Sequence, residues 1–371
     1  MIDPILFYKA LLDNNMDFFA GVPDSLLKNL CACITDRSES SRNIITANEG
    51  NAVGLACGYF VASGHYGVVY MQNSGLGNTI NPLLSIADRE IYEIPMLLII
   101  GWRGEPGIKD EPQHIKQGAV TLSLLDSMGI RYEVLENDFI PQLNRAKEYM
   151  DKELQPYALI VRKNTFSSYP FTPEVVDYPL SREQALSTVL QHLDKTDFIV
   201  STTGKTSREI FELRELRGES HAKDFLTVGG MGHTASIAMG MTFGSNQTIF
   251  CIDGDGSFLM HMGSFAIIGQ NAPENFKYIL INNGAHESVG GQPTVAFKIE
   301  PEAILYACGF KKVITAETDE EIIAGIASLK QGKRQALIIR THQGSRDDLG
   351  RPTVSPKENR RAMMNEFHSA R

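Results

Sequence analysis

Short apolar runs and longer amphipathic stretches alternate along the whole chain. The runs at 17–23, 67–72 and 94–101 have the length and side chains typical of buried strands. The stretches at 4–15, 25–33 and 49–63 are predicted to form helices. Strands separated by helices in this way predict an α/β fold with doubly wound parallel sheets and right-handed crossovers.

One segment interrupts the alternation. Residues 164–179 are rich in Pro, Ser and aromatic side chains and show no helical period, which indicates a linker. The sequence SREQ at 181–184 then matches a capping box at a helix start. A second series of expected strands follows, at 198–204, 225–230, 247–256, 276–284, 311–316 and 336–342. We therefore predict two α/β domains, 1–165 and 181–371, joined by a linker over 166–180.

Composition narrows the class of protein. The chain has 371 residues and a formal net charge of −9, which argues against nucleic acid as a partner but still allows a small anionic ligand held by local cations. No apolar run approaches the ~20 residues of a membrane span, and the N-terminus has no basic start, so a soluble cytoplasmic protein is expected. The five cysteines are odd in number and irregularly spaced, as expected for buried, reduced thiols.

Two polar clusters follow expected buried strands in the second half. Gly254, Asp255 and Gly256 end one strand, and Asn282 and Asn283 end the next. The segment between them has room for one crossover helix, so both clusters should emerge at the carboxyl ends of neighbouring parallel strands. Ligands of open α/β sheets bind at that edge.

The residue types in these clusters suit a diphosphate held through a divalent cation. Asp255 and an asparagine side-chain oxygen are hard ligands for Mg²⁺, and a backbone carbonyl just after the Asn pair can supply a third. Gly254 and Gly256 let the backbone approach phosphate oxygens closely. Ser257 is expected to open the next helix, with its hydroxyl and nearby N–H groups facing the anion. The alternative is two unrelated turns.

This arrangement resembles the signature of thiamine-diphosphate-dependent enzymes, and the resemblance extends over essentially the whole chain. It implies that Asp255, Asn283 and the carbonyl of Ala285 ligate Mg²⁺. The choice of Asn283 over Asn282 rests on the family's register. The resemblance also makes the first domain the pyrimidine-binding (PYR) domain and the second the diphosphate-binding (PP) domain, without the middle domain of longer relatives.

Three further segments match the family. ITANEGNAVGLACGYFVASG contains Glu49 as the glutamate that hydrogen-bonds the aminopyrimidine ring; a first-turn Glu that complements a helix dipole is the alternative. In VGGMGHTASIAMG, the resemblance implies that Met231 props the cofactor into its bent shape and that the Gly229 carbonyl accepts a hydrogen bond from the amine. In the TTG turn it implies that Thr203 and Gly204 contact the diphosphate.

The loops GVPDSLL, NSGLGNTINPL, GWRGEPGIKDEPQHIKQG and GSRDDLGRPTVSP resemble those of the phosphonopyruvate decarboxylases, which are close to the sulfopyruvate decarboxylases. The string KDEPQH favours the former. The resemblance implies non-oxidative decarboxylation of 3-phosphonopyruvate to phosphonoacetaldehyde and CO₂ in phosphonate biosynthesis. Sulfopyruvate decarboxylation, or another thiamine-diphosphate lyase or carboligase reaction, remains an alternative.

A phosphonate needs charge-assisted hydrogen-bond donors. The loop expected after the strand at 94–101 offers Arg103, Lys109, His114 and Lys116, and His114 could bind the anion or relay a proton. Asp24, Ser25, Ser74 and Asn78 are further candidates near strand ends. For each of these residues, a solvated charge or a structural role in a loop is the competing interpretation.

Two functions from other classes compete. A nicotinamide-dependent dehydrogenase would need G-x-G-x-x-G after the first strand, which is missing. A non-catalytic binding subunit would have no need of both Glu49 and the Asp255 and Asn283 pair.

The resemblance also implies an oligomer. In the family, Glu49 of one chain would meet the diphosphate site of another, so we expect at least a homodimer with active sites at the subunit interface. The expected substrate is a small anionic 2-oxo acid, and no nucleic acid or membrane partner is expected.

Overall fold

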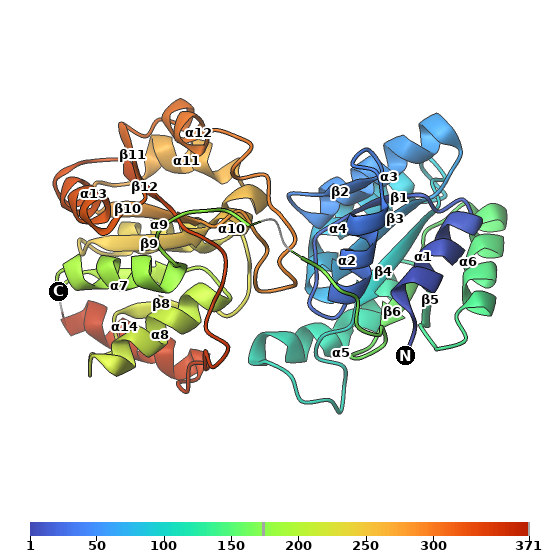
Figure 1. The fold of residues 1–371 in the computed structure, drawn as a ribbon, viewed down its shortest axis with the longest axis horizontal. Helices are drawn as coiled ribbons and strands as arrows, with labels where there is room; N and C mark the ends of the chain where they lie inside the picture. The colour runs from blue at the N-terminus through green and yellow to red at the C-terminus, as the bar shows by residue number, and fades with distance from the viewer. Residues whose placement is uncertain (173–174, 370–371) are drawn as a thin grey trace. The chain divides into compact units, whose positions relative to one another are not determined.

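The computed structural model describes residues 1–172 and 175–369. These residues form two compact units, each built on its own six-stranded parallel sheet (Figure 1). The first sheet contains β1–β6 and the second β7–β12. The predicted doubly wound α/β class is confirmed in both units. The boundaries predicted at 165 and 181 stay predictions.

The first unit alternates strands and helices in chain order. Its sheet order is β2-β1-β3-β4-β6-β5, so the chain passes from β1 outward to β2 and then returns to the other side of β1 at β3. Such a reversal is the topological switch point at which α/β proteins bind ligands. The elements are α1 (Pro4–Asp13), β1 (Phe18–Gly21), α2 (Lys28–Arg37), β2 (Asn43–Ile45), α3 (Glu49–Ser63), β3 (Gly67–Gln72), α4 (Leu76–Pro82), β4 (Met96–Gly101), α5 (Pro112–Ser127), β5 (Arg131–Val134), α6 (Ile140–Glu153) and β6 (Tyr157–Val161).

The second unit repeats this layout. Its sheet order is β11-β12-β10-β9-β7-β8, and the reversal falls between β7 and β9. The elements are α7 (Arg182–His192), β7 (Phe198–Ser201), α8 (Lys205–Leu216), β8 (Asp224–Leu226), α9 (Thr234–Gly244), β9 (Ile249–Gly254), α10 (Asp255–Met260), α11 (Ser264–Asn271), β10 (Phe276–Asn282), α12 (Pro301–Cys308), β11 (Lys312–Ala316), α13 (Asp319–Gln331), β12 (Gln335–Arg340) and α14 (Pro356–Ser369).

Both faces of each sheet are buried. In β3, Val68 and Tyr70 enter one apolar cluster, whereas Val69 and Met71 enter the cluster on the opposite face. This alternation follows from the two-residue repeat of a strand, and it explains why the central strands are apolar at almost every position. Helices cover both faces, which leaves the carboxyl ends of the strands as the place for polar side chains.

Local capping sets the helix starts that matter for the site. The Asn48 side chain accepts a hydrogen bond from the Asn51 N–H at 3.1 Å, so α3 begins at Glu49, and Gly64 ends the helix in the left-handed conformation. The capping box predicted for α7 is present, with Ser181 and Gln184 bonding reciprocally.

Three sequence-based expectations were wrong in detail. The helix expected from Ser25 begins at Lys28, because residues 25–27 form a turn. The polar segment after β4 is a loop only as far as Glu111. Pro112 then takes the first position of α5, for which its fixed φ is suited, so His114 and Lys116 lie on a helix. The single crossover helix expected after β9 is two short helices, the first beginning at Asp255 rather than Ser257.

The predicted linker has two described parts, 166–172 and 175–180; residues 173–174 lie outside the described structure. Phe166 is buried in the first unit's core, where its ring meets Phe7 edge-on at a centroid distance of 5.3 Å. All five cysteines are free thiols, four of them buried, as the sequence predicted. None of the helices in the described ranges is both long and apolar enough to cross a membrane.

Candidate functional site

The two polar clusters of the second unit lie at the same sheet edge. Strands β9 and β10 are adjacent and parallel (Figure 1). Their register pairs Ile281 with Gly254. Asp255 and Asn283 follow these positions by one and two residues, so both leave the sheet at its carboxyl edge. The prediction that both clusters follow neighbouring parallel strands is confirmed.

The Asp255 carboxyl group is buried and accepts hydrogen bonds from within the second unit. The Thr294 hydroxyl donates to its Oδ2 at 2.5 Å. Burial raises the pKa of Asp255 to about 6, although the Thr294 hydrogen bond and the charge of Arg182 act in the opposite direction. A buried carboxylate that is costly to ionise is stabilised by a bound cation, so Asp255 fits the role of a metal ligand.

The Asn283 side chain is held in one orientation. Its Nδ2 donates to Glu287 Oε2 at 2.7 Å, and its Oδ1 accepts the Ala285 N–H at 3.3 Å. The amide oxygen is therefore distinguished from the amide nitrogen by its partners. The carboxylate of Asp255, the amide oxygen of Asn283 and the carbonyl of Ala285 are hard oxygen ligands, a set that fits Mg²⁺.

Met231 and Ser257 lie beside the turn that follows β9. A Cβ atom on Gly256 would stand 3.1 Å from Met231 Cε and 3.2 Å from the His286 ring, so a larger residue would crowd both side chains. The Ser257 hydroxyl accepts the Gly232 N–H at 3.1 Å. The segment containing Gly229 and Met231 is thereby tied to the GDG turn.

The TTG turn extends this edge to a third strand. β7 pairs with β9 in a register that sets Ser201 beside Ile252, and a Cβ on Gly254 would lie 3.6 Å from Thr202 Cγ2. Gly204 has φ of +100°, a conformation that side chains disfavour, and it directly precedes α8. Thr203 and Gly204 therefore stand at the switch point between β7 and β9, where the sequence placed a diphosphate contact.

In the first unit, Glu49 lies buried at the first position of α3. Its Oε2 accepts a hydrogen bond from Asn78 Nδ2 at 2.7 Å. A Cβ on Gly75 would overlap Glu49 Oε1, so only glycine fits beside this carboxyl group. Burial raises the pKa of Glu49, with the Asn78 hydrogen bond opposing the shift. Glu49 is thus a buried, hydrogen-bonded carboxyl group at the start of α3, and its role toward the cofactor stays a prediction.

A second carboxyl group is buried at the switch point between β1 and β3. Asp24 accepts hydrogen bonds from Gln72 Nε2 at 2.6 Å and from the Leu26 N–H at 2.9 Å, and Ser74 Oγ donates to Gln72 Oε1 at 2.8 Å. Gly101 at the end of β4 leaves room for the carboxylate, since a Cβ there would overlap Asp24 Oδ2. Burial raises the pKa of Asp24.

Arg103 connects this carboxyl group to His114. Its Nη1 donates to Ser25 Oγ at 2.8 Å. Its Nε donates to Asp110 Oδ2 at 2.8 Å and its Nη2 to Asp110 Oδ1 at 2.5 Å. His114 Nδ1 lies 3.0 Å from Asp110 Oδ1. Burial lowers the pKa of His114, although Asp110 opposes the shift, so the ring is mostly neutral at neutral pH. Asp110, which the sequence reasoning missed, balances the charge of Arg103.

Six of the eight predicted substrate residues take part in these contacts: Asp24, Ser25, Ser74, Arg103 and His114 near the ends of β1, β3 and β4, and Asn78 beside Glu49. Lys109 and Lys116 are exposed and lie outside these hydrogen bonds. We selected Lys109 and Lys116 for their charge alone, and the charge of a residue in a polar segment does not show which way its side chain points. The signal for Asp110 was its place in KDEPQH, one turn before His114.

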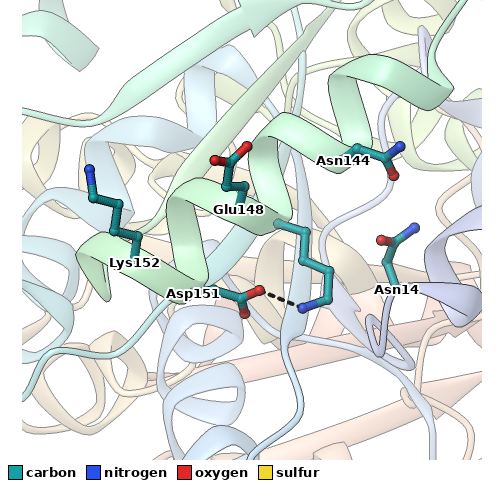
Figure 2. A pocket seen from close by; sticks show the side chains of 6 residues that line it. Asn14, Asn144, Glu148, Asp151 and Lys152 are labelled. Atoms are coloured by element: carbon teal, nitrogen blue, oxygen red, sulfur yellow. Dashed lines mark hydrogen bonds and ion pairs between the residues drawn. The ribbon is translucent and has the colours of Figure 1, made fainter.

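A surface hollow of about 420 Å³ lies elsewhere in the first unit (Figure 2). It is lined by Asn14 and by α6 residues, and Lys147 and Asp151, one turn apart on α6, form an ion pair at 2.6 Å. It contains none of the predicted site residues, and its positive and negative charges offset each other. We therefore assign the site to the strand ends.

Two doubly wound domains with polar clusters at their strand ends define a ligand-binding α/β protein, and comparison with known families specifies the class as thiamine-diphosphate-binding enzymes. The description "Thiamine pyrophosphate enzyme, N-terminal TPP binding domain" matches residues 5–125, and "Thiamine pyrophosphate enzyme, C-terminal TPP binding domain" matches residues 202–339; pyrophosphate is another word for diphosphate. The chain belongs to the thiamine pyrophosphate enzyme family. Between the two matched segments, the described residues complete the first sheet with β5 and β6 and open the second unit with α7 and β7, in agreement with the predicted lack of a middle domain.

The curated relatives span nearly the whole chain. A phosphonopyruvate decarboxylase of Streptomyces viridochromogenes is 33% identical over 91% of this chain and 88% of its own length. One of Streptomyces hygroscopicus is 32% identical over 91% and 87%. A sulfopyruvate decarboxylase of Methanosarcina acetivorans is 27% identical over 89% and 88%. The chain is thus related to decarboxylases of both kinds, in agreement with the predicted resemblance and the predicted carboxy-lyase class.

Proposed function

We propose that this enzyme decarboxylates 3-phosphonopyruvate to phosphonoacetaldehyde and CO₂, without oxidation, using thiamine diphosphate and Mg²⁺. The observation that carries the proposal is the near full-length similarity to two phosphonopyruvate decarboxylases at 33% and 32% identity. The arginine-centred network at the ends of β1, β3 and β4 supports it, because a phosphonate requires a cation at its site. Phosphonate biosynthesis in the cytoplasm is the setting we propose.

Thiamine diphosphate, when bound, supplies the electron sink for loss of the carboxyl group. In the proposed site, Asp255, Asn283 and the Ala285 carbonyl hold Mg²⁺. Backbone and hydroxyl groups at the strand ends hold the diphosphate, and Met231 and the Gly229 carbonyl support the aminopyrimidine. The residues proposed for the diphosphate are Thr203, Gly204, Gly254, Gly256 and Ser257.

Glu49 and Asp24 are the proposed proton-handling carboxyl groups. Each is buried, and burial raises the pKa of both. Glu49 holds a proton for a ring nitrogen of the cofactor, as a carboxyl group with a raised pKa can do near neutral pH. Asp24 can likewise stay protonated in the presence of an anionic substrate, which would be repelled by a carboxylate. His114, held at Nδ1 by Asp110, presents Nε2 for proton transfer.

The active enzyme is proposed to be a homo-oligomer, with a second copy of the chain covering part of α3. Gly54 and Gly58 on this helix have no atom within 4 Å of a built Cβ, and Leu55 and Val61 beside them are 40% and 74% exposed. Small and apolar residues on one helical face favour close packing against another protein surface. A second copy is the occupant that places Glu49 in a shared site.

Arg103→Lys should reduce kcat/KM for 3-phosphonopyruvate by about 10–100-fold, because a lysine ammonium cannot hold Asp110 in two places and also donate to the phosphonate, and one lost charge-assisted hydrogen bond to the substrate costs about 1.5–3 kcal/mol. Turnover of pyruvate, which has no second anion, should change less than about threefold. Steady-state kinetics on both substrates measures this. An equal loss on both substrates would show that Arg103 does not recognise the phosphonate.

The proposed function is tested by measuring kcat/KM for 3-phosphonopyruvate, sulfopyruvate and pyruvate with thiamine diphosphate and Mg²⁺ present. We expect a large preference for 3-phosphonopyruvate. Sulfopyruvate is the second candidate, supported by the 27% identity to a sulfopyruvate decarboxylase. A preference for sulfopyruvate would replace the substrate and keep the rest of the site. No turnover of any of the three would overturn the proposed reaction.

A further inference from the structure

Glu287 stands at the centre of a buried ion network beside the proposed metal site. Its Oε2 accepts hydrogen bonds from Arg182 Nη1 at 2.6 Å and from Asn283 Nδ2 at 2.7 Å. Its Oε1 accepts one from Lys205 Nζ at 3.1 Å. The side chain of Glu287 is only 12% exposed and that of Arg182 only 6%. Removing these charged groups from water costs free energy, and their mutual attraction offsets this cost only when the hydrogen-bond geometry is good.

The network is anchored from the side away from Asn283. Arg182 also binds Glu209 through Nε and Nη2, at 2.6 and 2.7 Å, and the Glu209 side chain is 1% exposed. Arg182 is the first residue of α7, and Lys205 is the first residue of α8, directly after the TTG turn. The first residues of two helices, Arg182 and Lys205, therefore hold the Glu287 carboxylate in place beside Asn283.

The consequence for Asn283 is a defined amide orientation. An asparagine side chain can turn its oxygen or its nitrogen toward a partner, but only the oxygen can ligate a hard cation. The Glu287 carboxylate accepts and cannot donate, so it attracts Nδ2 and repels Oδ1. Turning the amide over would bring two groups of negative character together in a site with little water. The oxygen is thereby kept available as a ligand.

The charges of the network also suit this role. Arg182 and Lys205 offset Glu209 and Glu287, so these four side chains carry no net charge. Loss of the Glu287 charge would leave one uncompensated positive charge near the proposed cation. Glutamine at this position would therefore weaken metal binding through this repulsion and through the weaker, uncharged acceptor that it offers to Asn283 Nδ2, whereas alanine would remove the acceptor altogether.

We propose that Glu287 is a positioning residue that holds the Asn283 amide in its metal-ligating orientation, with Arg182 and Lys205 fixing Glu287 in turn. This inference rests on the proposed function, since it takes Asn283 as a ligand of Mg²⁺. It predicts a defect that depends on the concentration of Mg²⁺, because Glu287 is proposed to act through the metal ligand and not on the substrate.

The test uses the full-length protein with Glu287→Gln, which keeps the shape and removes the charge. Isothermal titration calorimetry of thiamine diphosphate binding at a series of Mg²⁺ concentrations gives the half-saturating Mg²⁺ concentration without relying on turnover. We expect this concentration to rise about 10–100-fold, the usual effect of removing a group that orients a metal ligand. At saturating Mg²⁺, kcat should return to within about twofold of the wild-type value.

Two further variants sharpen the result. Lys205→Met should raise the half-saturating Mg²⁺ concentration by a smaller factor, because Arg182 still holds Glu287. Glu302→Gln is the matched control: like Glu287, Glu302 accepts from an arginine, Arg340 at 3.1 Å, and from a second donor, here the Thr315 hydroxyl at 2.6 Å, but these partners do not include Asn283. It should leave the half-saturating concentration unchanged. Melting temperatures without ligands show whether each variant is folded, and Glu287→Ala serves as a second substitution if Glu287→Gln is not.

Unchanged Mg²⁺ dependence in a folded Glu287 variant would overturn the inference. A loss of kcat that saturating Mg²⁺ does not restore would also overturn it, because it would place the role of Glu287 outside metal binding. These outcomes differ from a failure of the proposed function itself, in which the wild-type protein would not bind thiamine diphosphate with Mg²⁺ at all.

Discussion

Glu49→Gln should lower kcat by about 10²–10⁴-fold, the usual contribution of a positioned proton-transferring group. Glutamine can still accept the Asn78 hydrogen bond through its oxygen, but it cannot hold the exchangeable proton. The substitution is nearly isosteric, which matters because Gly75 leaves so little space beside the carboxyl group. Steady-state kinetics at saturating cofactor measures the loss, and wild-type kcat in this variant would exclude Glu49 from proton transfer.

The same substitution should make the ligand-free protein more stable at neutral pH. Burial holds the pKa of Glu49 above its unfolded value, so the folded state binds more protons than the unfolded state between the two pKa values. Wild-type stability therefore falls as pH rises through this interval, and the uncharged amide of the Glu49→Gln variant removes that dependence. The stability gain of the variant should vanish in acid, below the ordinary glutamate pKa of about 4.3. Urea unfolding at several pH values tests the sign; a variant less stable than wild type at pH 7 would contradict it.

Asp255→Asn should weaken Mg²⁺-dependent binding of thiamine diphosphate by more than about 100-fold, beyond the loss expected when a merely supporting group is removed. The variant loses the only carboxylate among the three proposed metal ligands, while an amide oxygen can still accept the Thr294 hydrogen bond. Calorimetric titration with the cofactor and Mg²⁺ measures the change. Binding within about threefold of wild type would remove Asp255 from the metal site.

The two variants together test the shared site. If Glu49 and Asp255 of one active site come from different chains, each heterodimer of the two inactive variants contains one intact site. Random assembly in a co-expressed mixture then restores about a quarter of the wild-type activity. Restoration in the mixture, with none in either variant alone, is expected. An inactive mixture containing heterodimers would place both residues of a site in the same chain.

The sequence predicted the strand ends that carry the proposed cofactor site. It predicted α3 and β3 with the bounds that the structure shows, Glu49–Ser63 and Gly67–Gln72. The sequence also predicted that Asp255 and Asn283 follow two neighbouring strands. These features are local, because strand length, the alternation of apolar residues and capping residues can all be recognised within a short stretch of sequence.

The partners of the site residues were less accessible to sequence reasoning. Thr294 bonds Asp255 across 39 positions, and Arg182 bonds Glu287 across 105. No periodicity connects such positions. Asp110 and His114 are close in sequence, yet their pairing was hidden because the start of α5 at Pro112 went unrecognised. Asp110 stands in the loop just before α5 and His114 in the first turn of that helix, so their contact depends on how the loop enters the helix.

The sequence by itself therefore determined the α/β class, the two-domain layout and the identity of the residues at the strand ends. Only the tertiary structure decided that Arg103 is paired with Asp110, that Lys109 and Lys116 are exposed, and that Glu287 accepts a hydrogen bond from Asn283. The physical reason is that strands and helices follow from neighbouring residues, whereas the burial and charge environment of a side chain depend on distant segments that only the folded chain brings together.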